Sequence, residues 1–153
     1  MARFRFRLDP VLDQREHAEN ERAADHARAL ADQLTAQRVH DELLDKRDAL
    51  RGQLLAEHAA FDAETLRATY AHLDYLDRAL AASQQRVDAC LAETERARER
   101  LVDAAKDRKV LSTLKDRRRE TFDRDAALAE QRELDDANAR AFERIHHTRG
   151  RTT

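Results

Sequence analysis

The sequence predicts an all-α fold: a long two-helix antiparallel coiled-coil hairpin with an overhanging C-terminal helix. The 153 residues include only 2 Gly and 1 Pro, the residues that most often turn a chain. Charged residues make up 39% and aromatic residues 5%, which is typical of long helices and coiled coils. Regularly spaced leucines distinguish this chain from a disordered one of equally low mean hydropathy, −0.88.

We expect a single coiled-coil domain. Its predicted segments are an N-terminal arm (1–9), a first helix (10–58), a turn (59–62), a second helix (63–147) and a frayed tail (148–153). In the arm, Phe4, Phe6 and Leu8 alternate with arginines, the pattern of an extended segment with one apolar side. Asp9 and Pro10 then start the first helix as its N-cap and first helical residue.

The turn is inferred from a helix-start signal, because no Gly-Pro pair marks it. Asp62 is a predicted N-cap, with Glu64 in the first helical turn. Phe61 is placed to pack on Leu66 as a hydrophobic staple. One unbroken helix that dimerises in parallel remains the alternative.

Apolar spacing predicts which faces of the two helices meet. The first helix carries two offset stripes, diluted by Gln33, His40 and Arg47: Ala23, Ala27, Leu30 and Leu34, then Leu43, Leu50, Leu54 and Phe61. The second helix carries one heptad stripe, interrupted by Asp77 and Gln84: Leu66, Tyr70, Leu73, Leu80, Val87 and Leu91. Cys90 beside this stripe is expected to be a small packing residue.

The two predicted helices differ in length, roughly 70 Å against roughly 125 Å at about 1.5 Å per residue. Folding the chain near residue 61 places Pro10 beside Ser112. Beyond that point the second helix has no partner, which leaves an apolar stripe uncovered: Leu114, Phe122, Leu128, Leu134, Phe142 and Ile145. Because each buried Leu or Phe contributes about 1.5–3 kcal/mol, the stripe should seek a cover, and the arm is the local candidate.

The densest basic run, Lys106–Arg124, begins where that partner is lost, although the chain has a net charge of −2. It reads as a solvated helix face, a protein-docking face or a DNA-binding helix. A DNA-reading basic helix should lead directly into a strong leucine zipper. Here the seam that follows is charged: Arg118, Asp125, Arg132 and Asp135. We therefore favour protein docking and expect no nucleic acid partner.

We expect no enzyme activity, no cofactor and no small-molecule substrate. Two isolated glycines cannot form a phosphate loop. Only Glu143 and His146 have the Glu-x-x-His spacing, and a metal site in a helix bundle needs two such pairs, so we expect no metal. The lone Cys90 fits a reducing compartment, and the sequence shows no signal peptide or apolar spanning segment, so we expect a cytoplasmic protein.

Three segments resemble the FliJ/YscO family of type III secretion stalk proteins. The first is the opening Phe4–Arg15, FRFRLDPVLDQR, and the second is Tyr70–Leu80, YAHLDYLDRAL. The third is Arg108–Arg119 with its following block Glu130–Asp136. Their order and spacing extend the resemblance over nearly the whole chain, and the Phe-Arg-Phe opening favours a flagellar member over an injectisome one.

The resemblance implies a non-enzymatic stalk, monomeric when free, at the inner-membrane export apparatus. It would dock into the hexameric export ATPase, promote its assembly and activity, and link it to the export-gate membrane protein and export chaperones. The residues implied to face the ATPase are Phe4, Phe6, Leu8, Lys109, Leu111, Leu114, Arg117, Arg118 and Arg119. Those implied for the gate are Leu66, Tyr70 and Leu73, although seam packing is the commoner role for such residues. A structural homodimeric coiled coil without an ATPase partner is the alternative.

Overall fold

The protein is an all-α hairpin of two long helices, given by a computed structural model that describes the backbone of residues 3–149 and the side chains of 3–57 and 59–142. Helix α1 spans Asp9–Glu57, the short 3₁₀ helix η1 spans His58–Ala60, and α2 spans Ala63–Arg149. No strand occurs in this described part. The predicted fold class is confirmed, and the alternative of one unbroken helix is wrong. Of the predicted frayed tail, residues 150–153 lie outside the described residues.

The chain divides into two compact units, each of which we describe by itself. The hairpin unit comprises Arg15–Lys106, and the arm unit comprises Met1–Gln14 with Asp107–Thr153. The predicted segment limits differ from the helix ends by one residue at each end of α1 and by two at the end of α2. The single-domain organisation stays a prediction.

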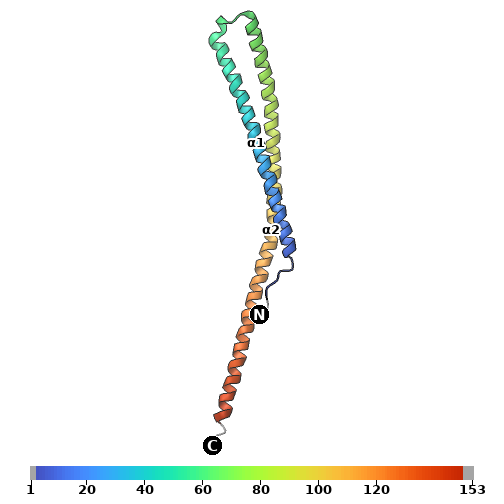
Figure 1. Ribbon diagram of the computed structural model, residues 1–153, viewed down its shortest axis with the longest axis vertical. Helices are drawn as coiled ribbons and strands as arrows, with labels where there is room; N and C mark the ends of the chain where they lie inside the picture. Colours follow the sequence, from blue (N-terminus) through green and yellow to red (C-terminus); the bar gives the residue numbers. More distant parts are fainter. Residues whose placement is uncertain (1–2, 150–153) are drawn as a thin grey trace. The chain divides into compact units, whose positions relative to one another are not determined.

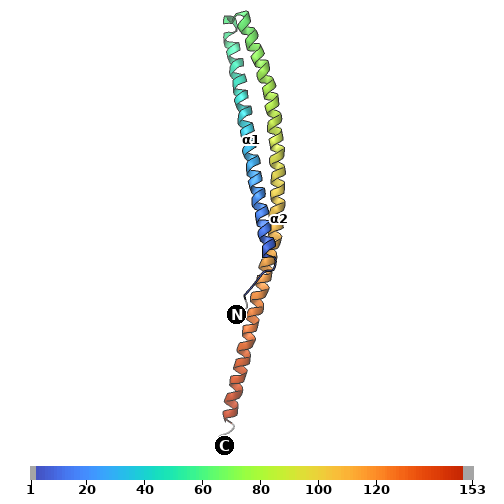
Figure 2. The same cartoon turned by 45° about the vertical axis from the view of Figure 1, so that its right-hand side comes forward.

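In the hairpin unit, α1 and α2 lie side by side and are joined by the turn at one end (Figures 1 and 2). Two polar side-chain contacts among the described residues show how the helices run relative to each other. His40 Nδ1 lies 2.8 Å from Ser83 Oγ, and an Arg51 guanidinium nitrogen lies 3.3 Å from an Asp77 carboxylate oxygen. The higher-numbered residue of α1 meets the lower-numbered residue of α2, which is the order of an antiparallel pair.

The interface of the hairpin unit is a heptad seam of small and polar residues with scattered leucines. On α2, buried and half-buried residues follow spacings of three and four: Leu66, Thr69, Leu73, Leu76, Leu80, Ser83, Val87, Cys90, Thr94 and Ala97. On α1 the matching series is Ala29, Gln33, Ala36, His40, Leu43, Arg47, Leu50 and Leu54. Alternation of three and four is the coiled-coil repeat, so both faces keep one register throughout.

The first predicted stripe of α1 is therefore wrong. Leu30 and Leu34 are 41% and 51% exposed, and Ala23 and Ala27 are exposed as well. The seam instead uses small residues, because Ala36 packs with Val87 and Cys90 in a buried cluster. On α2, Tyr70 and Leu91 are likewise outside the seam, at 54% and 47% exposed, whereas Cys90 is buried as expected.

One polar pair lies within this seam. The Ser83 hydroxyl donates its proton to the Leu80 carbonyl at 2.9 Å. Its oxygen is then left to accept a hydrogen bond from His40 Nδ1, which places a proton on that nitrogen. Because a slip of the helices would leave both groups half-buried without partners, the pair favours this register.

The turn is closed by a helix cap at Asp62. Its carboxylate oxygen accepts the Thr65 backbone N–H at 2.7 Å, and its carbonyl accepts the Leu66 N–H at 3.0 Å. Hydrogen bonding by the Thr65 side chain, and next by its backbone N–H, holds the pKa of the Asp62 carboxyl below its usual range. Phe61 before it is extended, with φ −83° and ψ 137°. No described residue has a positive φ, which explains how the turn forms without glycine.

The start of α1 differs from the prediction by one residue. The Leu8 carbonyl accepts hydrogen bonds from the backbone N–H groups of Val11 and Leu12, at 3.0 and 2.9 Å. The helix therefore begins at Asp9, which is not the cap. Instead the Asp9 carboxylate lies 2.7 Å from Lys115 Nζ on α2, close to the predicted pairing of Pro10 with Ser112.

Replacing the cap should weaken the hairpin in a pH-dependent way. Asp62→Ala leaves N–H groups of the first turn of α2 without a partner, and we expect the Tm to fall by about 2–4 °C at pH 7. Since folding lowers the pKa of Asp62, its stabilisation is complete above the unfolded value of about 4 and is lost as the pH falls through the lower folded value. Thermal melts followed by circular dichroism from pH 7 to pH 2 measure both effects.

The matched control is Asp62→Asn, which can cap the helix but does not titrate. Its Tm at pH 7 should stay close to that of the unchanged protein. The difference in Tm between Asp62→Ala and the unchanged protein is the one that should narrow in acid. A Tm for Asp62→Ala equal to that of the unchanged protein at pH 7 would show that the cap does not stabilise the turn.

Candidate protein-docking site

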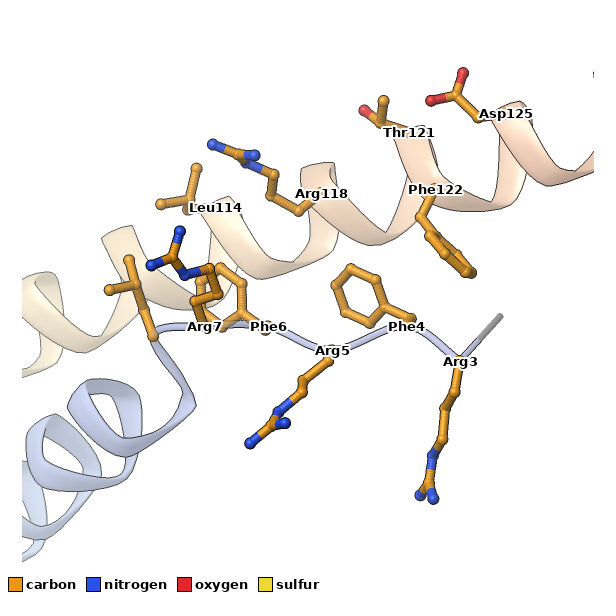
Figure 3. Close-up of a pocket in the computed structure, with 11 residues that line it drawn as sticks. Arg3, Phe4, Arg5, Phe6, Arg7, Leu114, Arg118, Thr121, Phe122 and Asp125 are labelled. Carbon is orange, nitrogen blue, oxygen red and sulfur yellow. The ribbon is translucent and has the colours of Figure 1, made fainter. Parts of the chain in front are cut away.

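In the arm unit, the N-terminal arm lies along α2 with its apolar side toward the helix (Figure 3). The Phe4 ring meets the Phe122 ring with centroids 5.6 Å apart and planes tilted by 55°. Phe6 is buried, at 7% exposed. Arg3 and Arg5 extend away from the helix in Figure 3, whereas Arg7 lies beside Phe6 on the helix side of the arm. The arm thus turns its two phenylalanines toward the helix and two of its arginines away from it.

A groove of about 790 Å³ runs between the arm and α2. The arm contributes its residues 3–8, and α2 contributes Leu114, Arg118, Thr121, Phe122 and Asp125. The lining therefore combines aromatic and aliphatic side chains with four guanidinium groups and one carboxylate. Such a groove suits a partner segment with both apolar and acidic side chains.

The basic residues around the groove are accessible. Arg117, Arg118 and Arg119 are all exposed, and Arg119 makes one weak ion pair, 4.0 Å from Asp123. Lys109 is exposed as well. Exposed charges of one sign steer a complementary partner and set its orientation more than they add affinity. The arm unit thus presents a basic surface around an apolar groove.

All nine residues implied for the ATPase lie in this unit. Leu111 and Leu114 are half-buried, and Leu8 is 38% exposed. Phe6 is used for packing within the chain, so its side chain offers a partner little surface. Their contact with a partner stays a prediction. Sequence reasoning placed Phe122 in the uncovered stripe but not in the site, although its spacing of eight residues from Leu114 puts both on one helix face.

The residues implied for the export gate lie in the hairpin unit, and they divide into two kinds. Leu73 is buried in the seam and Leu66 is half-buried. Tyr70 is 54% exposed and, together with Leu55 at 85%, lines a shallow groove beside Asp74. Only Tyr70 of the three presents a large accessible side chain, and a gate contact stays a prediction.

Beyond the arm, α2 is solvent-facing along its described length. Every side chain from Asp123 to Phe142 is exposed. The predicted apolar stripe is visible there, with Leu128 at 46% and Leu134 at 65% exposed. Ile145 lies outside the described side chains, as do Glu143 and His146.

Among the described side chains, no group of three or more His, Cys, Asp or Glu residues is placed to hold a metal ion. Within the described helices, no segment is long and apolar enough to cross a membrane.

A family model matches this chain. The model of the family described as "Flagellar FliJ protein" matches residues 4–146, nearly the whole chain. No curated protein and no solved structure matches the chain. The match covers both the arm unit and the hairpin unit, and it agrees with the family resemblance seen in the three sequence segments.

The aromatic contact of the arm can be tested by a double-mutant cycle. We expect Phe4→Ala and Phe122→Ala each to destabilise the arm unit and to share a coupling energy of about 0.5–1.5 kcal/mol, because each ring loses the same neighbour. Urea unfolding measures the free energies. Phe4→Ala with Leu128→Ala is the matched control, since Leu128 lies outside the groove, and its coupling should be near zero. Additive effects of Phe4 and Phe122 would contradict the contact.

Proposed function

The chain belongs to the flagellar FliJ protein family, a component of the flagellar type III export apparatus, and on that premise we propose that it is a non-enzymatic stalk of the export ATPase. In this proposal the arm unit docks into the hexameric ATPase and promotes its assembly and activity. The observation that supports it best is the groove between arm and helix, whose apolar lining is edged by arginines.

The arrangement of the arm supports docking as a preformed surface. Because Phe4 and Phe6 hold the arm on α2, its arginines are presented without ordering a free segment at the moment of binding. Avoiding that ordering cost favours affinity. A stalk that contacts several subunits at once also stabilises the assembled ring, since any ligand that binds only the assembled state shifts the equilibrium toward it.

The hairpin unit supplies the second part of the proposal. We assign to its exposed face at Tyr70 and Leu55 the contact with the export-gate membrane protein, and to the hairpin unit as a whole the escort of export chaperones. Exposed aromatic and leucine side chains are common anchors of protein interfaces. Association with the inner-membrane apparatus would follow from these protein contacts.

Charge reversal on the docking face tests the proposal. Arg117/Arg118/Arg119→Glu should raise the concentration that half-maximally stimulates ATP hydrolysis by the export ATPase at least about tenfold, because three steering charges change sign. Ring assembly, followed by electron microscopy or light scattering, should weaken in parallel.

Arg96/Arg98/Arg100→Glu is the matched control, with the same change of charge on the same helix within the hairpin unit. It should stimulate the ATPase as the unchanged protein does. Equal stimulation by both triple variants would remove the arm unit as the docking surface.

A further inference from the structure

The charges of α2 within the arm unit are sorted along the helix. Residues 107–119 carry six Lys or Arg and two Asp, and the arm adds Arg3, Arg5 and Arg7. Residues 123–142 carry six Asp or Glu and only three Arg. The basic section therefore precedes an acidic section on one continuous helix, and both are exposed at most positions.

Among the described residues, Arg118 of the basic section and Asp135 of the acidic section are two of several exposed charges on this helix that make no ion pair. Both belong to the seam of the predicted heptad pattern, where a charge is unfavourable unless it is paired. They are separated by 17 residues, or about 25 Å along the helix, so they cannot reach each other within one chain.

We propose that in the free protein a second copy of this chain covers the arm unit, with the two α2 helices antiparallel. Parallel pairing in register would set basic against basic and acidic against acidic. Antiparallel pairing about a two-fold axis between Ala126 and Ala127 sets each basic section against the partner's acidic section. In that register Arg118 lies opposite Asp135 of the second copy, and the symmetry repeats the pair.

The same register gives two apolar residues of this face a position in the dimer. It places half-buried Leu114 opposite Ala139 of the second copy, and it places exposed Leu128 close to the two-fold axis. The groove beside the arm gives the second helix a place to enter, because its lining carries four arginines against one carboxylate. Since the second copy would occupy the docking surface, self-association and ATPase docking would exclude each other. In this proposal the free protein is a dimer, whereas the sequence resemblance implied a monomer.

Charge-swap rescue tests this pairing without any ATPase present, so its outcome is independent of the proposed stalk function. Sedimentation equilibrium in low salt should show a concentration-dependent dimer for the full chain. Arg118→Asp and Asp135→Arg should each raise the dimer dissociation constant at least about tenfold, because each sets like charges together twice. The double variant should return it to within about threefold of the unchanged protein.

Rescue is diagnostic because residues 118 and 135 are too far apart to pair within one chain. Far-UV circular dichroism checks that all three variants keep the helix content of the unchanged protein, as expected for exposed positions. A chain that stays monomeric up to about 100 μM, or a helical double variant that dimerises no better than the single variants, would overturn the proposal.

Discussion

The packing of Phe4 on Phe122 is the contact on which the arm unit depends. A single helix exposed on all sides is marginal in water, because its stability comes mainly from covering one apolar face. In the arm unit the cover is the arm segment 3–8, whose phenylalanines face the helix. The same contact determines where the arginines of the arm stand, so packing and charge presentation cannot be separated.

In the hairpin unit the two helices cover each other along a seam. The seam holds seven leucines, but it also places alanine, serine, histidine and threonine at positions where leucine is usual. Small residues allow close approach of the backbones, but each layer buries little apolar area. The stability of the hairpin then comes from many seam layers that each contribute little. Polar pairs such as His40 with Ser83 fix the register of the two helices. The large apolar residues Leu30, Leu34 and Leu55 remain on the surface, where partners can reach them.

The fold class and the turn could be predicted from the sequence because both depend on interactions between residues close together in the chain. Scarcity of Gly and Pro forces long helices, and Asp62 caps a helix through hydrogen bonds to residues three and four positions away. The prediction of the first stripe of α1 failed because it followed the large residues Leu30 and Leu34, which are exposed. The observed seam follows spacings of three and four through the small residues Ala29 and Ala36. The start of α1 was misplaced by one residue because the Leu8 carbonyl accepts the first hydrogen bonds of the helix. Asp9 instead pairs with Lys115, a residue whose proximity depends on the tertiary fold.

Hydrogen exchange of the full chain with and without the hexameric export ATPase tests the central claim, that the arm unit is the docking surface, most directly. The account predicts slower amide exchange in residues 3–14 and 107–122 on addition of the ATPase, with residues 30–90 unchanged. Protection confined to residues 30–90, or no protection anywhere at saturating ATPase, would contradict it.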